Sequence, residues 1–154
     1  MTNSIDNKTL TNVDLSGADL ANVNLSNVDL TNVNLTNANL SEANLEGADL
    51  TGANLKGADL YNTNLEDANL EGTSLYGANL KGANLRDANL KGANLEGADL
   101  TGANLKGANL SYANLEGTDL YNVNLTGTNL SKAKLRDAYL KGANLSYADL
   151  KALI

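Results

Sequence analysis

The chain lacks several residue types that carry chemistry in proteins. It has no cysteine, which excludes disulfides, thiol nucleophiles and Cys-based metal sites. Histidine, the commonest general base and a frequent metal ligand, is absent as well. There is no proline to fix a kink, and no tryptophan or phenylalanine, so the apolar content is mostly Leu and Ala. These absences predict a thin, regular core in a protein that is not an enzyme, and we expect no cofactor and no bound metal.

The sequence shows no targeting or membrane segment. Its first residues, MTNSIDNKT, lack a basic start and an apolar run of signal length, and no stretch is apolar enough to span a bilayer. We therefore expect a cytoplasmic protein that makes no membrane contact.

The formal charge of −7 is spread unevenly along the chain. Residues 1–75 carry eleven acids and two bases, whereas residues 76–154 carry seven acids and nine bases. An acidic balance without a basic stripe disfavours direct binding of nucleic acid.

A five-residue repeat organises the chain from Leu10 to Leu150. Leucine occupies every fifth position there, 29 times without exception. From Leu15 on, a small residue (Ala, Val or Thr) stands two positions before each leucine, and usually Asp or Asn stands one before. The residue after the leucine is almost always polar, and the next is most often Gly or Asn. An α-helix would scatter these leucines around its axis, and a straight strand would send alternate leucines to opposite faces. The period therefore predicts a short extended piece followed by a corner, repeated so that every leucine points inward.

The second residue after each leucine is expected to make the corner. Gly and Asn tolerate the positive φ that the third position of a type II turn requires. At four of the corners that have neither Gly nor Asn we expect another turn type: Glu42, Tyr112, Lys132 and Tyr147.

Such corners wind the chain into coils that pair through backbone hydrogen bonds. The period alone leaves the number of sides open. Four sides are favoured because they would align seven asparagines in one ladder: Asn24, Asn44, Asn64, Asn84, Asn104, Asn124 and Asn144. The leucines expected to line one wall of the core are then Leu20, Leu40, Leu60, Leu80, Leu100, Leu120 and Leu140.

The run from SGADLANVNL to KGANLSYADL resembles the pentapeptide-repeat family, whose repeat is a small residue, Asp or Asn, Leu or Phe, a polar residue and Gly. The resemblance covers about nine-tenths of the chain. It implies an all-β fold, a right-handed four-sided parallel β-helix with about 20 residues per coil and about seven coils. Family members are abundant in cyanobacteria, and most have no assigned biochemical role. We divide the chain into an N-terminal cap segment, 1–9, and the β-helix, 10–154.

The two ends of such a solenoid need covers, because a terminal coil exposes its apolar layer and an unpaired edge. We expect Ile5 to cover the first coil. Leu153 and Ile154 either fold over the last layer or pack against another subunit, so a monomer and an end-to-end dimer both remain open.

The repeat and the family resemblance lead to two hypotheses about function. The first is a non-catalytic structural or protein-interaction solenoid with an unknown protein partner. The second is implied by the resemblance, because some family members resemble duplex DNA in shape and negative charge and bind DNA gyrase in its place. Here that role would depend on an acidic partner surface in the N-terminal half: Asp14, Asp19, Asp29, Asp49, Asp59, Glu66 and Asp67.

Two groups of side chains are interpreted as non-catalytic. Carboxylate pairs one coil apart, such as Asp29 with Asp49 and Asp99 with Asp119, are expected to accept hydrogen bonds from backbone at the corners rather than to form catalytic dyads. The four tyrosines between Tyr112 and Tyr147 are expected at different faces or heights, as solvated side chains.

Overall fold

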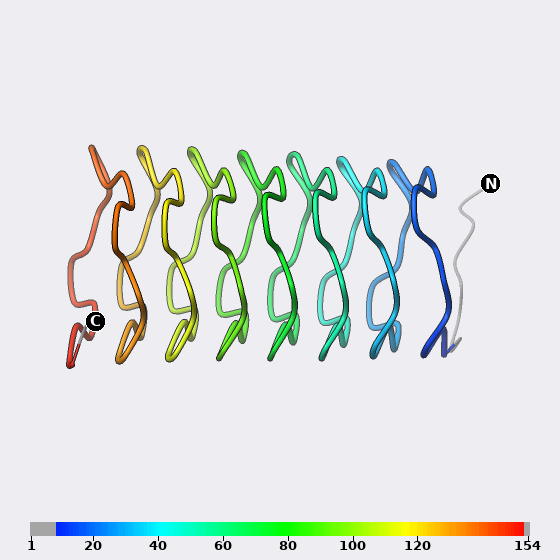
Figure 1. Cartoon of the computed structure of the whole chain (residues 1–154), viewed down its shortest axis with the longest axis horizontal. Helices are drawn as coiled ribbons and strands as arrows, with labels where there is room; N and C mark the ends of the chain where they lie inside the picture. The colour runs from blue at the N-terminus through cyan, green and yellow to red at the C-terminus, as the bar shows by residue number, and fades with distance from the viewer. Residues whose placement is uncertain (1–8, 153–154) are drawn as a thin grey trace.

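The computed structural model describes residues 9–152, which form a stack of similar coils (Figure 1). One-residue parallel β-bridges join the residue before each leucine to the residue 20 positions later, from Thr9↔Asp29 to Asn129↔Asp149. Because this offset never changes, one coil contains four pentads, and residues 9–152 make just over seven coils. The predicted four-sided parallel β-helix is confirmed. The described residues contain no helix, and therefore none long and apolar enough to cross a membrane.

We number the four faces in the order in which the chain reaches them. Face 1 takes the pentad of Leu10, face 2 that of Leu15, face 3 that of Leu20 and face 4 that of Leu25, and each face recurs every 20 residues. A pentad runs from two residues before its leucine to two residues after it. In each pentad the residue before the leucine is called the ladder residue, and the two after it are the first and second corner residues.

Three backbone hydrogen bonds per pentad hold neighbouring coils together. The N–H of Leu35 donates to the carbonyl of Asn54 in the next coil at 2.7 Å, and the N–H of Asn54 donates back to the carbonyl of Val33 at 2.9 Å. At the corner, the N–H of Asn37 donates to the carbonyl of Lys56 at 2.9 Å. The same pattern repeats along the rod, so no coil folds without a neighbour.

Every corner has the same backbone conformation. The turn closes with a bond from the N–H of the following small residue to the leucine carbonyl, as from Ala38 to Leu35 at 3.0 Å. The second corner residue has positive φ at all positions from Asn12 to Ala152. This includes the four residues expected to use another turn, with φ values of 57° at Glu42, 62° at Tyr112, 59° at Lys132 and 61° at Tyr147.

The expectation for those four corners is therefore wrong. At three of these corners the N–H of the residue with positive φ donates to a carbonyl of the next coil, as from Glu42 to Tyr61 at 2.8 Å. Tyr147 lies in the last coil, where the preceding carbonyl, that of Ser146, accepts the N–H of Gly127 at 2.9 Å. Bonds to a neighbouring coil thus hold all four corners in the same turn. An L-residue accepts this left-handed conformation at a cost of roughly 1–2 kcal/mol.

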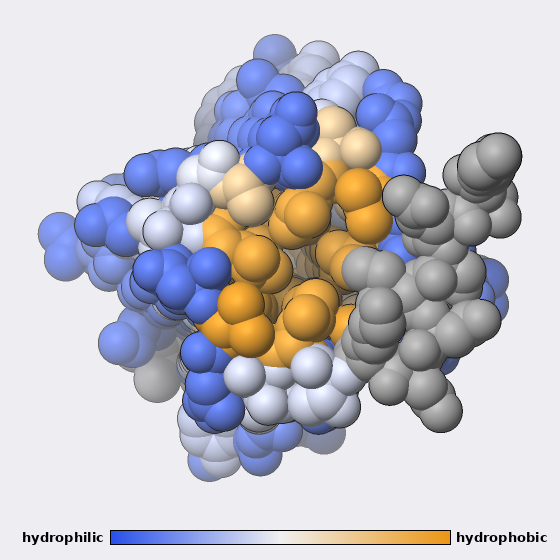
Figure 2. All heavy atoms as spheres, turned by 90° about the vertical axis from the view of Figure 1, so that its right-hand side faces the viewer, coloured by the Kyte–Doolittle hydropathy of each residue, from blue (hydrophilic) through white to orange (hydrophobic). Residues whose placement is uncertain are grey.

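Leucines and small residues fill the interior. All leucines from Leu25 to Leu130 are at most 2% exposed, and each contributes about 1.5–3 kcal/mol by burial. Of the predicted wall, Leu20 and Leu140 near the ends are partly buried, whereas the others are buried: Leu40, Leu60, Leu80, Leu100 and Leu120. Figure 2 looks along the rod from its N-terminal end and shows the apolar interior surrounded by polar side chains.

The expected covers of the two ends lie outside the described residues. These are Ile5, with most of the segment 1–9, and the terminal pair Leu153 and Ile154.

Candidate functional surface

The ladder residue completes the backbone hydrogen bonding of its corner. In the middle coils, the N–H of the first corner residue is the one N–H of the pentad without a backbone acceptor. It donates to the side-chain Oδ1 of the Asn or Asp two residues earlier, as from Glu66 to Asn64 at 3.2 Å. The bond occurs at every Asn or Asp ladder position from Asp14 to Asp149. The carboxylates of the repeat thus hold corners together, as the sequence predicted.

The asparagines of face 4 form the predicted ladder through the middle of the rod. The amide of Asn64 donates to Oδ1 of Asn44 at 3.1 Å, and the amide of Asn84 donates to Asn64 at 3.1 Å. The next two bonds, Asn104 to Asn84 and Asn124 to Asn104, measure 3.3 and 3.2 Å. All four amides donate toward the N-terminal end, and each acceptor oxygen also receives a corner N–H.

The seven acids of the predicted partner surface do not share a face. Asp14 lies on face 2, Asp19 and Asp59 on face 3, Asp29 and Asp49 on face 1, and Glu66 and Asp67 on face 4. Several of them already bind the chain itself. Glu66, for instance, pairs with Arg86 at 3.2 Å and accepts the amide of Asn84 at 3.0 Å. The structure therefore offers no continuous acidic stripe built from these residues.

Hydrogen bonds lower the pKa of two of these carboxyls. For Asp29, the hydroxyl of Thr31 lowers the pKa most, and the N–H of Thr31 adds to the effect. For Asp14, the N–H of Ser16 lowers the pKa most, followed by the Ser16 hydroxyl, and the amide of Asn34 contributes less. Both groups are thus held in the charged form that accepts these bonds best.

Asp99 and Asp119 occupy neighbouring rungs of face 3, as predicted. Nζ of Lys81 lies 3.0 Å from Oδ2 of Asp99. The hydrogen bond and charge of Asp99 raise the pKa of Lys81, and the charge of Asp119 adds to this. Desolvation raises the pKa of Asp99, but its bonds with Thr101 and Lys81 outweigh that effect and leave the pKa lowered. Within residues 9–152, no three acidic side chains gather as ligands for a metal ion.

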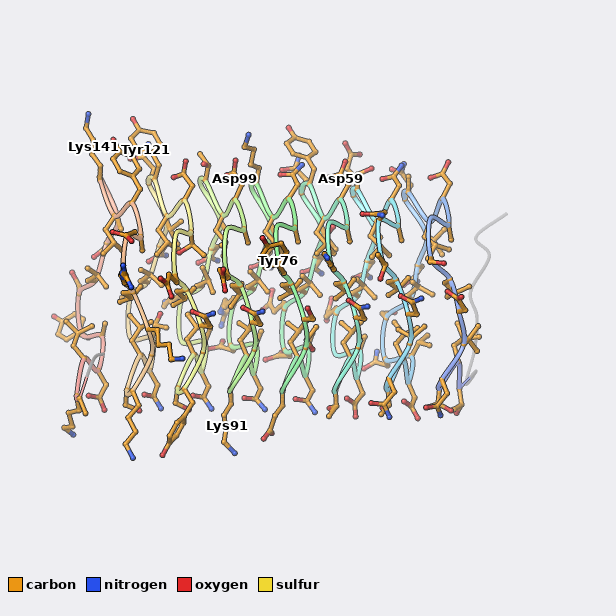
Figure 3. The ribbon with its side chains drawn as sticks, viewed as in Figure 1. Asp59, Tyr76, Lys91, Asp99, Tyr121 and Lys141 are labelled. Atoms are coloured by element: carbon orange, nitrogen blue, oxygen red, sulfur yellow. The ribbon has the colours of Figure 1, made fainter. Side chains whose placement is uncertain are left out.

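Two of the C-terminal tyrosines do come together. The rings of Tyr121 and Tyr139 stack with centroids 6.2 Å apart and an interplanar angle of 18°. Tyr121 projects from the edge of the rod in Figure 3, beside Lys141. The two residues lie on one face in neighbouring coils, so they differ in height as expected, but their rings are in contact rather than scattered. Tyr121 and Tyr139 are 18 positions apart in the sequence. Because one coil contains 20 residues, a first corner residue lies close to the ladder residue that comes 18 positions later on the same face. Lys81 and Asp99 are related in the same way.

Other exposed tyrosines contact lysines of the chain itself. Nζ of Lys56 lies 5.5 Å from the ring centroid of Tyr76, and Nζ of Lys132 lies 4.9 Å from that of Tyr112. Lys132 also donates to the Tyr112 hydroxyl at 2.9 Å. This hydrogen bond, and then the charge of Lys132, lower the pKa of Tyr112.

With the repeat geometry established, the chain can be compared with known families. A family model described as pentapeptide repeats matches in eight copies, over residues 9–47, 29–67, 63–102, 88–127 and 118–152. The chain belongs to the pentapeptide-repeat family. Proteins of this family are generally non-catalytic.

Solved structures of this family come from several biological settings. HetL, a pentapeptide repeat protein involved in heterocyst differentiation regulation in the cyanobacterium Nostoc sp. strain PCC 7120, is 34% identical, with 94% of this chain and 84% of HetL covered and a TM-score of 0.29. A pentapeptide repeat protein of the Arabidopsis thaliana thylakoid lumen is also 34% identical, with 80% and 69% covered and a TM-score of 0.31. Full-length QnrB1, a plasmid-mediated fluoroquinolone resistance protein, is 19% identical, with 96% and 93% covered and a TM-score of 0.43.

A comparison with curated proteins found no match. The solved structures named above share the repeat, but their roles vary.

Proposed function

We propose that this pentapeptide-repeat protein is a non-catalytic interaction rod that binds a protein partner through its polar faces. The observation that carries the proposal is that four positions of each pentad have structural roles and one does not. The leucine and the small residue fill the core, while the ladder residue and the second corner residue fix the turn. The first corner residue is left to vary on the surface, and it differs from coil to coil.

The first corner residues supply the chemical variety of the surface. Along face 3 they are Ala21, Ser41, Tyr61, Lys81, Thr101, Tyr121 and Lys141. A stiff scaffold that presents varied side chains at fixed spacing suits recognition of another protein, because little order has to be gained on binding.

A pull-down from a native extract tests this proposal. The immobilised rod is expected to retain a defined protein that free rod displaces and that rod immobilised after thermal unfolding does not retain. Retention of the same proteins by folded and unfolded rod would argue against a folded interaction surface.

DNA mimicry of the kind that targets gyrase is the second candidate. The observation that favours it is the charge of the N-terminal half, eleven acids against two bases in residues 1–75. The distribution of the seven predicted acids over four faces weakens it, because a DNA mimic needs its charge on connected surfaces.

A gyrase supercoiling assay separates the two candidates. The interaction rod is expected to leave supercoiling unchanged at equimolar and at excess protein. Inhibition that fades as salt rises, and that is lost when Asp14, Asp19 and Asp29 are changed to Asn, would instead support mimicry.

A further inference from the structure

Face 3 combines aromatic and acidic side chains more than the other faces do. Three of the six tyrosines lie on it: Tyr61, Tyr121 and Tyr139. It also carries five acids and two bases, a net charge of −3: Asp19, Glu42, Asp59, Asp99 and Asp119 against Lys81 and Lys141. Tyrosines are enriched at protein–protein interfaces, so face 3 is the first place to look for a partner.

The tyrosine pair on this face differs from the exposed rings on faces 1 and 2. The rings of Tyr76 and Tyr112 each have a lysine of the chain within 5.5 Å of the centroid. Among the described residues, Tyr121 and Tyr139 have no such cation over their rings and stack on each other instead. Their exposed fractions are 37% and 50%. The ring surface that attracts a cation in the other two cases is here open to one from another molecule.

Asp119 lies next to this pair and has an unused oxygen. Its Oδ1 accepts the N–H of Tyr121 at 2.9 Å. On eleven other rungs an asparagine of the next coil also donates to the ladder side chain, but the next ladder residue here is Tyr139. Its neighbour Asp99 is paired with Lys81, whereas Asp119 belongs to no ion pair within residues 9–152.

From this juxtaposition we infer that Tyr121, Tyr139 and Asp119 form a docking site for an arginine side chain of a protein partner. The inference rests on the proposed interaction function and adds the place and the chemistry of recognition. A guanidinium is planar and permanently charged, so it can stack on a tyrosine ring while it donates to a carboxylate. A lysine ammonium satisfies the charge but not the stacking. Lys141 lies beside Tyr121 (Figure 3), and its positive charge repels the incoming guanidinium and so limits the affinity for arginine.

The test uses short peptides as probes. Acetyl-Gly-Arg-Gly-amide is titrated into the full-length ¹⁵N-labelled protein, with matched peptides that carry lysine or the neutral isostere citrulline. The arginine peptide is expected to shift the backbone amide signals of Tyr121, Tyr139 and Asp119, and to bind more tightly than the lysine peptide. The citrulline peptide is expected to bind most weakly, because it stacks without charge.

Variants that respect the repeat make the test specific. Tyr139→Asn restores the usual ladder residue, so the fold is expected to hold while the dissociation constant for the arginine peptide rises about two- to fivefold. Lys134→Asn restores the ladder residue on face 2 and is expected to leave binding unchanged. Asp119→Asn keeps the acceptor for the Tyr121 N–H and is expected to weaken binding, whereas Asp14→Asn is its matched control on face 2. Lys141→Gln is expected to tighten binding.

Equal effects of Tyr139→Asn and Lys134→Asn, or shifts spread over all acidic positions, would overturn the site. The pull-down, repeated with Tyr139→Asn, distinguishes a failure of this site from a failure of the proposed function. If Tyr139→Asn retains the partner protein as well as the wild type does, the site is wrong and the interaction function stands. If the wild type retains no partner, it is the proposed function that fails.

Discussion

The side-chain Oδ1 of Asn94 accepts a hydrogen bond from the backbone N–H of Glu96 at 3.2 Å. One coil earlier on the same face, Ser74 replaces the asparagine, and within residues 9–152 no side chain accepts the N–H of Tyr76. These two neighbouring rungs show what the ladder residue does: it supplies the acceptor that the backbone of the corner lacks.

Ser74→Asn should therefore stabilise the protein. The new side chain can accept the N–H of Tyr76 and can join the ladder between Asn54 and Asn94, for a gain of about 0.5–1.5 kcal/mol in the free energy of unfolding. Urea unfolding followed by circular dichroism measures the change. The reverse substitution, Asn94→Ser, is the control and should destabilise by a similar amount; a loss of stability in both variants would contradict this role.

Gly52 and Gly92 should respond differently to alanine, although both have φ of +66°. The left-handed conformation costs alanine roughly 1–2 kcal/mol at either site. At Gly52 the added Cβ would also lie 2.5 Å from Oδ1 of Asn32, whereas at Gly92 nothing lies within 4 Å. Gly52→Ala should thus lower the melting temperature more than Gly92→Ala. In the double variant Gly52→Ala with Asn32→Gly the excess should vanish; if it persists, the contact is not its cause.

Leu80→Lys should unfold the rod or divide it at its middle. Leu80 has no exposed surface. Burying an unpaired ammonium in this apolar layer costs more free energy than the burial of the layer's apolar side chains contributes. Lys106→Gln on face 4 is the surface control and should change the unfolding free energy by only a few tenths of a kcal/mol. Lys81 is unsuitable as that control because it pairs with Asp99. Comparable melting losses in Leu80→Lys and Lys106→Gln would refute the assignment of inside and outside.

Acid should destabilise the rod through the carboxyls whose pKa is lowered on folding. The pKa of Asp29 and that of Asp14 lie below their ordinary value of 3.8, and that of Glu71, paired with Lys91, lies below 4.5. A lowered folded pKa contributes stability that is present above the ordinary value and is lost as the pH falls through the folded one. The melting temperature should hold from pH 7 to 5 and fall below about pH 4.5.

Asp29→Asn tests the cause of this acid sensitivity. The amide oxygen still accepts from Thr31 but does not titrate, so the variant should lose less melting temperature than the wild type between pH 5 and pH 3. Parallel losses in wild type and variant would show that Asp29 contributes nothing to the pH dependence.

Much of the fold could be predicted from the sequence because the repeat is local. Each pentad carries its own inward leucine, its own corner and its own acceptor, so the positions of Leu80, Gly52 and Asn94 in the pattern indicate burial, turn and hydrogen bond before any coil is formed. The Asn ladder of face 4 also needed only the assumption of four sides. The conformation at Glu42 could not be predicted from the sequence, because the backbone preference of glutamate argues against positive φ.

Sequence by itself thus determined the bend in every pentad and the aliphatic inner wall, because these depend on residues at most a few positions apart. Tertiary structure decided everything that depends on the 20-residue coil. It imposed positive φ on Tyr112 through bonds to the next coil, placed Lys81 against Asp99, and stacked Tyr121 on Tyr139. Those contacts join residues 18 or 19 positions apart, and only the stacking of complete coils converts such separations into neighbours in space.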